Sequence, residues 1–465
     1  MSFKTMLGMP WSGRRHMLFA LLVFLPLFFG IYAVKIAPTH RPTGDARYYL
    51  AGAYNILEHG TFSSQRVDGE PTPEAHRPPA YSWFLAQGMR FIPALEGADH
   101  SWFTGQADTL APEFVWLKYM QVLLLLGIAM LVAQVVFDLT GRFSYAQWAL
   151  WIMAFHPVLH RYVQRFYSEL FGTFMITCFS TVFYYALKKR NVLLFGLAGL
   201  LLGAVTLVFP QWKYIMPVAV VSVALFGLLE KNGRKRLLVG AVLLLVGFQC
   251  VVLPWKTRNE NLFDREYISG RGGSILLLRA YYDQMPADAY ASSFLYWTYG
   301  LPKYLLKTFV DEEHYSYLVR DNDGSAIDLT RREKERLAQS VADDAAFDKT
   351  LMSVALKRIL EHPVRHLLVS IPIGYRSLQD PTFSVFNLVV FFYFVYAFFS
   401  CLRGREYVVC CLLAPAAALV CFNALVTHGL PRYTWQLVPI VWTGALYGWF
   451  RWRHSGARRK TNHAH

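Results

Sequence analysis

The sequence predicts an all-α protein that crosses a membrane many times. Hydrophobic residues make up 55% of the 465 residues, charged residues only 17%, and the mean hydropathy is +0.28. A soluble domain has fewer apolar and more charged residues. Apolar runs of about 20 residues, long enough to cross a hydrocarbon core of roughly 30 Å, recur along the chain. We expect about ten such spans, at about 17–37, 114–137, 143–160, 166–187, 191–209, 213–229, 236–254, 382–402, 406–426 and 433–450.

Basic residues indicate the orientation of these spans. The first span follows Lys4, Arg14 and Arg15 and lacks a small-residue cleavage site, so we expect an uncleaved signal anchor. Lysine and arginine accumulate in short connections on the cytoplasmic side of a membrane. The basic residues that define this side are Lys188, Lys189, Arg190, Lys231, Arg234, Lys235, Arg236, Arg403, Arg405 and those of the 451–460 tail. Both termini are therefore expected to be cytoplasmic.

The net charge of +15 follows mostly from this topology. Nucleic-acid binding would require a basic face with stacking aromatic residues on a soluble module, so we expect no nucleic-acid partner. The six cysteines all lie in apolar segments, which argues against structural disulfides and against a cysteine zinc site.

Two long polar stretches, 38–113 and 256–381, fall on the expected outer face and predict a small helical cap there. In the first, a helix is expected from Asp45 to a glycine stop at His59-Gly60, and a second over 79–91, after a pair of prolines. In the second, a charged helix is expected over 330–361. The apolar stretch 364–375 is too short to span, so we expect it to lie on the bilayer surface. The whole chain, 1–465, is predicted to form one membrane domain.

Two acidic residues stand at the outer ends of predicted spans. Asp45 lies a few residues beyond the first span, where a low local dielectric makes an ionised carboxylate costly unless it has a function or a cation. The alternative is a helix N-cap, a position that aspartate favours. Glu169 begins the fourth span, where the helix dipole also favours an acid in the first turn. Two carboxylates that face one pocket could divide proton transfer and orientation of a substrate.

Some basic residues oppose the charge trend. The short outer connections hold only Arg161, Arg165, Lys213 and Arg432. A lipid phosphate bound at the outer interface would explain them, and snorkelling to lipid headgroups is the alternative. Arg77 precedes two prolines, which fix its backbone and suit a guanidinium aimed at a phosphate. Arg258 follows Pro254-Trp255, a pattern that is also typical of any membrane interface.

The order of several short motifs resembles a known family. The motifs are Gly44-Asp45, His76-Arg77-Pro78-Pro79-Ala80-Tyr81, Tyr167-Ser168-Glu169, Pro254-Trp255-Lys256-Thr257-Arg258-Asn259 and Pro431-Arg432-Tyr433. Over most of the chain this order resembles the glycosyltransferase C superfamily, in the branch that contains protein O-mannosyltransferases and bacterial aminoarabinose transferases.

The resemblance implies roles for individual residues. They are Asp45 and Glu169 as catalytic acids; Arg77, Arg432, Lys213 and Arg258 as ligands of a donor phosphate; and Tyr81, His76 and Tyr433 as residues of the acceptor site or pocket. The sequence differs from the family pattern at two positions. Phe209-Pro210 stands where many members have a basic residue before proline, and His76 replaces an acid of the aminoarabinose branch. We expect no cofactor and no metal; the alternative is a divalent ion held by Glu74 and His76.

The resemblance further implies transfer of a sugar from a polyprenyl-phosphate donor to a lipid, glycan or protein acceptor. It would take place on the periplasmic or extracellular side of a bacterial plasma membrane, with membrane lipids as further partners. The alternative from another class is a transporter or flippase of lipid-linked sugars without covalent chemistry. Transporters more often show paired halves and ionisable residues near mid-membrane, whereas the acids here cluster at outer helix ends.

Overall fold

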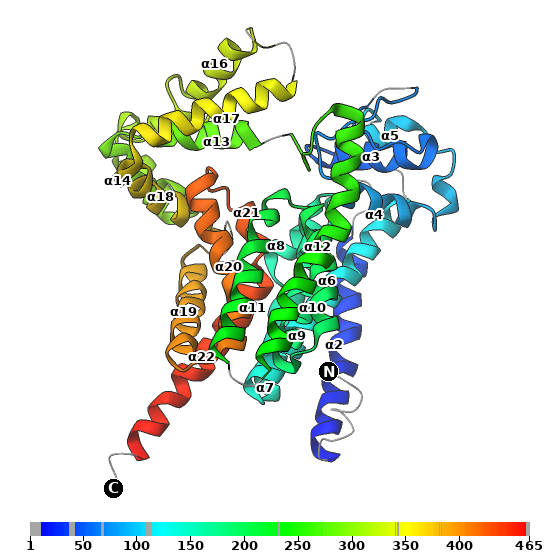
Figure 1. The fold of residues 1–465 in the computed structure, drawn as a ribbon, viewed down its shortest axis with the longest axis vertical. Coiled ribbons are helices and arrows are strands. Elements are labelled where there is room, and N and C mark those ends of the chain that lie inside the picture. The colour runs from blue at the N-terminus through cyan, green and yellow to red at the C-terminus, as the bar shows by residue number, and fades with distance from the viewer. Residues whose placement is uncertain are drawn as a thin grey trace. The chain divides into compact units, whose positions relative to one another are not determined.

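The computed structural model describes residues 11–36, 42–66, 69–107, 113–230, 233–270, 272–339, 341, 344–380, 382 and 384–461. These residues form 21 α-helices joined by loops and short 3-10 turns, so the prediction of an all-α fold is confirmed (Figure 1). Lys4 and Lys231, which were used to orient the chain, lie outside the described residues.

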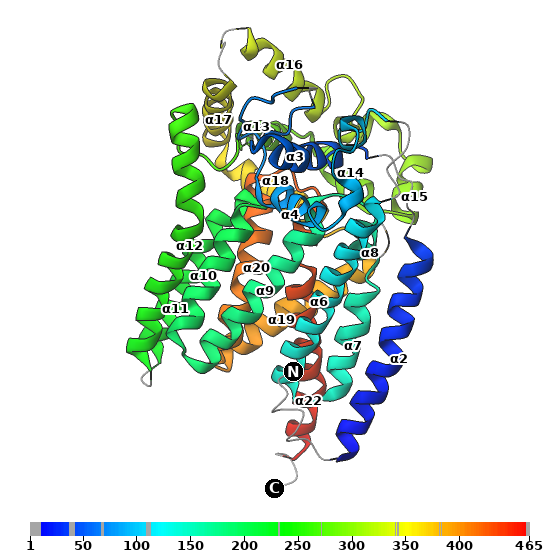
Figure 2. The same cartoon turned by 90° about the vertical axis from the view of Figure 1, so that its right-hand side faces the viewer.

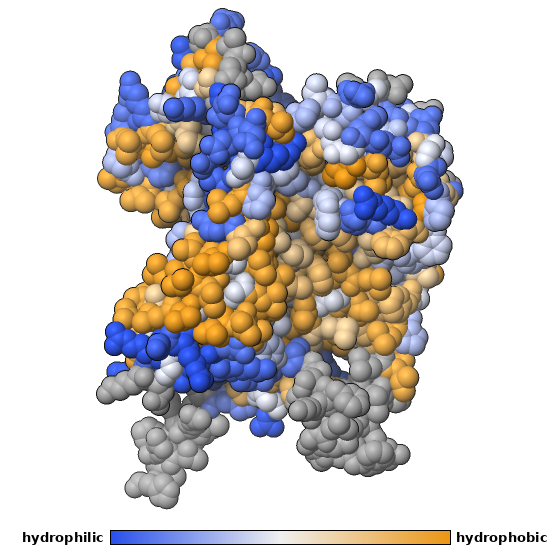
Figure 3. Space-filling model, turned by 45° about the vertical axis from the view of Figure 1, so that its right-hand side comes forward, coloured by the Kyte–Doolittle hydropathy of each residue, from blue (hydrophilic) through white to orange (hydrophobic). Residues whose placement is uncertain are grey.

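The multi-pass membrane character is also confirmed, but the number of spans is not. Six helices in the described part of the chain are long and apolar enough to cross a membrane. They are α6 (Phe114–Thr140), α9 (Ser168–Lys189), η2 with α11 (Pro210–Tyr214 and Ile215–Leu229), α12 (Arg234–Phe263), α19 (Ser384–Arg403) and α20 (Tyr407–Val426). Figure 3 shows a band of apolar side chains over the spanning helices, with hydrophilic residues beyond both ends of the band. The prediction of ten spans was wrong, and about six is the number that the structure supports.

The other four predicted spans correspond to helices that are short or run into charged sequence. They are α2 (Trp11–Lys35, apolar over Leu22–Lys35), α7 (Phe143–Ala154), α10 (Val192–Thr206) and α22 (Val438–Thr461). Proline lacks a backbone N–H and its ring crowds the preceding turn, so it is common at the start of a helix and often interrupts an apolar run. Pro157 therefore separates α7 from α8 (Pro157–Val163), and α10 ends shortly before Pro210. Helix α22 follows the separate turn of helix α21 (Arg432–Trp435) and continues into the basic tail.

The chain divides into two compact units. Unit 1 comprises residues 1–72 and 81–174, and unit 2 comprises residues 73–80 and 175–465. In unit 1, α3 (Ala46–His59), α4 (Ala80–Met89) and α5 (His100–Thr104) pack with the start of α6 around a shared apolar core. The glycine stop of α3 is confirmed, because Gly60 has a left-handed backbone and its N–H bonds the carbonyl of Asn55. The single domain over 1–465 stays a prediction.

Unit 2 contains closely packed spanning helices. Helices α10 and α12 lie side by side in both views, with α11 against α12 (Figure 2). A Cβ added at Gly199 would lie 2.1 Å from the carbonyl oxygen of Leu244, so only glycine allows this approach of the two backbones. Small residues at helix crossings are how helices gain contact within a membrane.

Six helices of unit 2 form a cap, defined here as residues 272–377. They are α13 (Gly272–Tyr282), α14 (Ala287–Trp297), α15 (Leu301–Phe309), α16 (Ala326–Ala338), α17 (Asp344–Glu361) and α18 (Pro363–Ser377). The cap has its own apolar core, to which α13, α14, α17 and α18 contribute. The charged helix expected over 330–361 is two helices, α16 and α17. The first begins earlier than expected, because the Ser325 hydroxyl caps it by accepting from the N–H of Asp328.

A fully buried arginine ties the cap to a spanning helix. Arg279 of α13 has no exposed surface and pairs with Asp283 one turn later. It also donates to the Ser370 hydroxyl at 2.7 Å, to the His366 carbonyl at 3.0 Å and, through Nε, to the Ala424 carbonyl of α20 at 3.1 Å. His366 Nδ1 lies 2.7 Å from the second oxygen of Asp283. A single cation thereby joins α13, α18 and the last turn of α20.

We predict that Asp283→Asn strongly destabilises the protein. The change keeps the side-chain shape but leaves Arg279 as a buried charge without its counter-ion, which costs about 3–5 kcal/mol. Thermal unfolding of the purified protein in nanodiscs measures the loss. The matched control is Asp323→Asn, because the Asp323 side chain is 95% exposed and its pair with Arg332 contributes at most about 1 kcal/mol. Equal melting temperatures for the two variants would contradict the proposed importance of the Arg279 network.

Candidate functional site

Unit 1 brings the two acidic motifs together. The Tyr167 hydroxyl donates to the carbonyl of Thr43 at 3.3 Å, and the hydroxyls of Tyr49 and Ser168 lie 3.1 Å apart. Gly44 has a φ of 58°, and a Cβ there would lie 2.6 Å from the Tyr167 hydroxyl oxygen. The Gly44-Asp45 turn therefore lies against Tyr167-Ser168-Glu169, although more than 120 residues separate the motifs.

Asp45 occupies the N-cap position of α3, but its side chain makes no capping hydrogen bond. The N-cap alternative therefore does not account for the carboxylate. Glu169 lies in the first turn of α9 and is half-buried, as is Asp45.

Tyr81 of α4 contacts the ring of Tyr49 and lies near Glu169. It is 1% exposed, its ring lies edge-on to that of Tyr49 with centroids 5.1 Å apart, and its hydroxyl donates to Gln121 at 3.2 Å. Burial raises the pKa of Tyr81 well above its ordinary value, and the negative charge of Glu169 raises it further. Tyr81 therefore stays protonated, and the Glu169 carboxylate lies near enough for its charge to act on it.

Two buried polar residues of α6 belong to this region of unit 1 and escaped the sequence analysis. Gln121 donates to the carbonyls of Val163 and Arg165, both at 3.1 Å, and so supports the turn that leads to Tyr167. Lys118, three residues earlier, has no exposed surface. Residues three apart share a helix face, so Lys118 lies next to Gln121. A lysine within an apolar run is costly, and this feature of the sequence could have indicated Lys118.

The segment that carries Arg77 belongs to unit 2. The N–H of Ala80 bonds the carbonyl of Leu207 at 3.2 Å, and Arg258 of α12 donates to the carbonyl of Glu74 at 3.3 Å. Arg77 is only 5% exposed, which argues against an arginine that merely extends to lipid headgroups. Arg258 also stacks on Trp255, with its guanidinium 4.5 Å from the ring centroid. The structure thus brings the Arg77 segment and Arg258 together.

Other predicted site residues of unit 2 are more exposed. The side chains of His76 and Lys213 are exposed, and the Lys213 ammonium lies 4.8 Å from the centroid of the Tyr214 ring. Among the described residues, no group of three or more histidine, cysteine or acidic side chains could hold a metal ion.

Arg432 belongs to a cationic cluster, defined as Arg376, His428, Arg432 and Lys303. Arg376 donates to the His428 carbonyl at 3.0 Å and to the Tyr282 hydroxyl at 3.1 Å, and its guanidinium lies 4.9 Å from the Trp297 ring centroid. Arg432 lies over the ring of Tyr433 at 5.6 Å. Burial, together with the positive charges of Arg376 and Arg432, lowers the pKa of His428 to about 3. His428 is therefore neutral at physiological pH.

The cationic cluster has the character of an anion site. Burial lowers the pKa of Lys303, and the neighbouring charges of Lys307 and Arg376 contribute, so Lys303 lies close enough to sense both. The hydrogen-bond partners of Arg376 are neutral, and no carboxylate in the described part of the chain pairs with it. An excess of positive charge on aromatic rings favours a bound anion. The sequence did not indicate Arg376, because the segment that precedes it was expected to form a helix on the bilayer surface.

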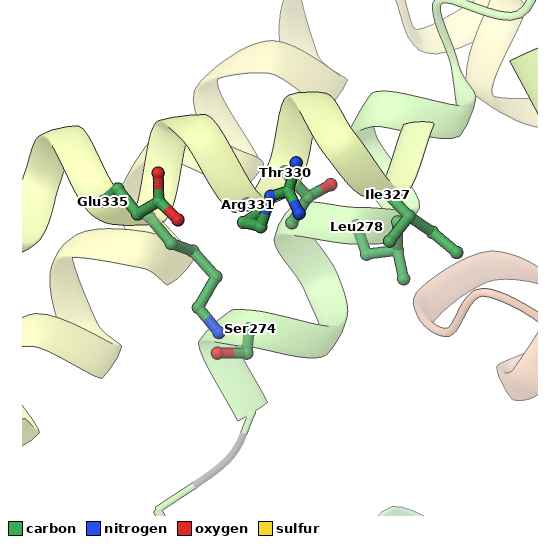
Figure 4. Close-up of a pocket in the computed structure, with 7 residues that line it drawn as sticks. Ser274, Leu278, Ile327, Thr330, Arg331 and Glu335 are labelled. Atoms are coloured by element: carbon green, nitrogen blue, oxygen red, sulfur yellow. The ribbon is translucent and has the colours of Figure 1, made fainter. Parts of the chain in front are cut away.

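The cap also holds an open cavity of about 390 Å³ between α13 and α16 (Figure 4). Its lining combines short polar residues with charges of both signs, and none of it belongs to the predicted site. The lining residues are Ser274, Leu278, Ile327, Thr330, Arg331, Lys334 and Glu335. Arg331 already pairs with Asp328. The cavity therefore lacks the excess of one charge that the cationic cluster has.

No protein-family model matches this chain. A search of curated proteins found no similar sequence. The resemblance to glycosyltransferases rests on the motifs alone.

Proposed function

We propose that this protein is a membrane glycosyltransferase that moves a sugar from a polyprenyl-phosphate donor to a lipid, glycan or protein acceptor. The observation that carries the proposal is the contact between the Gly44-Asp45 turn and Tyr167-Ser168-Glu169. Two acids that the motif order assigns to catalysis are held at one place in unit 1, and helix capping does not explain Asp45.

In the proposed reaction an acceptor oxygen attacks the anomeric carbon of the sugar. The bond from that carbon to the phosphate oxygen breaks, and polyprenyl phosphate leaves with the electron pair. Asp45 accepts the proton when the acceptor is a hydroxyl group. Glu169 orients the acceptor, beside the protonated hydroxyl of Tyr81.

The leaving group is an anion, and the motif resemblance assigns Arg77, Arg432, Lys213 and Arg258 to the donor phosphate. Preorganised donors aimed at developing charge are among the strongest contributions to catalysis. We assign Arg432 and its neighbour Arg376 to the phosphate, because Arg376 donates to the His428 carbonyl and the charges of both arginines act on the His428 side chain. Arg77 and Arg258 form a second candidate pair, and the exposed Lys213 is a third, less constrained candidate.

We further propose that the cap lies on the periplasmic or extracellular face of a bacterial plasma membrane and that both termini are cytoplasmic. The basic connections before α10 and α12 and after α19 support this orientation.

Orientation can be tested by thiol labelling of intact cells. Asp323→Cys places a thiol at a cap position that is 95% exposed, and we expect an impermeant maleimide to label it without permeabilisation. Lys235→Cys, at the exposed start of α12, is the matched control and should react only after the cells are opened. The unsubstituted protein corrects for its native cysteines. The reverse pattern of labelling would place the cap in the cytoplasm.

We predict that Asp45→Asn abolishes sugar transfer without loss of folding. Loss of a general base lowers turnover by about 10²–10⁴-fold. Cells that lack the chain are complemented with parent or variant, and mass spectrometry of surface glycolipids and glycoproteins reports a mass difference of one sugar. Glu169→Gln should reduce transfer less. Glu58→Gln, an exposed acid on α3, is the matched control and should transfer normally. Parental transfer by Asp45→Asn would remove Asp45 from catalysis and favour a transporter.

We predict that Arg432→Ala weakens use of the donor more than affinity for the acceptor. One charged hydrogen bond contributes about 1.5–3 kcal/mol, which is roughly ten- to a hundred-fold in turnover efficiency. Arg432→Lys should lie between parent and alanine, because lysine keeps the charge but loses the planar fork. The donor identified by the complementation experiment is titrated against each variant. Arg331→Ala, whose side chain is 66% exposed in the cap, is the control. An unchanged donor titration for Arg432→Ala would leave Arg77 and Arg258 as the phosphate ligands.

A further inference from the structure

Helix α15 of the cap exposes an apolar face. Leu301, Tyr304, Leu305 and Phe309 recur at helical spacing, and between 41% and 78% of each is exposed. Leu306 lies on the other side of the same helix, is 2% exposed and belongs to the core of the cap. The helix is therefore amphipathic, with its apolar side turned away from the protein.

Helix α18 has the same property. Val364, Leu367, Leu368 and Ile371 form an exposed face, with 54% to 69% of each exposed. The opposite face carries Ser370 and the His366 carbonyl, both bound to Arg279. A single exposed leucine needs no explanation, but two helices that each present four exposed apolar residues do.

Both helices are attached to the ends of spanning helices. The N–H of Tyr299, two residues before α15, bonds the hydroxyl of Ser384, the first residue of α19, at 3.2 Å. Helix α18 is joined through Arg279 to Ala424 in the last turn of α20. Helices α19 and α20 are candidate membrane spans. Spans of their length end near the boundary between hydrocarbon and headgroups, so we expect the exposed faces of α15 and α18 at that depth. Figure 1 shows α18 beside the end of α20 and next to α14.

The charges on the two helices favour one kind of surface. Helix α15 carries Lys303 and Lys307, and α18 carries Arg365 and Arg376, and neither helix contains an acidic residue. Basic amphipathic helices bind at membrane surfaces with their apolar face among the acyl chains, and anionic headgroups strengthen the binding. We propose that α15 and α18 form a lipid-binding platform that inserts into the adjacent leaflet and binds anionic phospholipid.

The platform has a consequence for the cationic cluster. Arg376 is the penultimate residue of α18, and Lys303 belongs to α15. Insertion of both helices would hold these two cations at headgroup depth, where the phosphate of any membrane-embedded lipid lies. The platform itself requires no glycosyl transfer, so the two proposals can fail separately.

Photo-crosslinking tests the occupant of the exposed faces directly. A benzophenone amino acid replaces Tyr304 or Leu368 in the full-length protein, which is irradiated in nanodiscs of phosphatidylcholine with phosphatidylglycerol and in native membranes. We expect phospholipid adducts by mass spectrometry at both positions. The same replacement at Glu335, exposed on α16, is the matched control and should give few. Protein adducts in native membranes, or lipid yields as low as at Glu335, would overturn the proposal.

A charge reversal tests the preference for anionic lipid. Lys307→Glu should lower the lipid adduct yield at Tyr304 by about five-fold or more in the anionic nanodiscs, because each basic residue near such a surface contributes about 1 kcal/mol. The yield in pure phosphatidylcholine should change little. Lys349→Glu, exposed on α17, keeps the overall charge change and should have no effect. Equal yields for parent and Lys307→Glu in anionic nanodiscs would reject the anionic preference.

Discussion

The Arg279 network is the interaction on which the arrangement of the cap in unit 2 depends. A guanidinium without exposed surface is tolerated only when its charge is paired and its donors are bonded. Arg279 meets this condition with the carboxylate of Asp283, which directly follows α13, with one hydroxyl and one carbonyl of α18, and with one carbonyl of α20. Since two of these elements are cap helices and the third spans the membrane, the network determines at what height α18 lies against α20. No apolar contact of similar area would be as selective, because the directions of the hydrogen bonds allow only one register of the helices.

Helix α18 combines three properties in 15 residues. One face bonds Arg279, the opposite face is apolar and exposed, and the C-terminal turn holds Arg376 against Trp297 and the His428 carbonyl. These properties follow from helical periodicity: His366 and Ser370 are four residues apart on one side, and Leu367, Leu368 and Ile371 are on the other. A rotation of the helix about its axis would break the buried hydrogen bonds and, at the same time, turn the apolar face into the protein. The buried bonds and the proposed lipid contacts therefore support the same orientation.

The sequence predicted those features that depend on local chemistry. The glycine stop after α3 and six of the predicted spans follow from capping chemistry and apolar length, and the structure has them. The four additional spans failed for local reasons that hydropathy alone does not register: Pro157 separates α7 from α8, α10 has only 15 residues, α2 is apolar only over Leu22–Lys35, and α22 runs into the basic tail. Arg376 could not be assigned for a different reason. Its importance depends on neighbours distant in sequence, and no periodicity within α18 indicates that its last arginine meets Trp297.

The two acidic residues differ in how far local structure explains them. An acid in the first turn of α9 is favoured by the helix dipole, so Glu169 would be expected there even in a protein without a catalytic site. Asp45 is different, because it stands at the N-cap of α3 without making the capping hydrogen bond for which aspartate is preferred. The stabilisation that this residue type normally contributes, about 1 kcal/mol, is not obtained. Gly44, whose left-handed backbone lies against Tyr167, sets the position of the turn instead. The position of this carboxylate is therefore set by the neighbours of the turn and not by capping of the helix that it precedes, and this distinction makes Asp45 the more informative of the two acids.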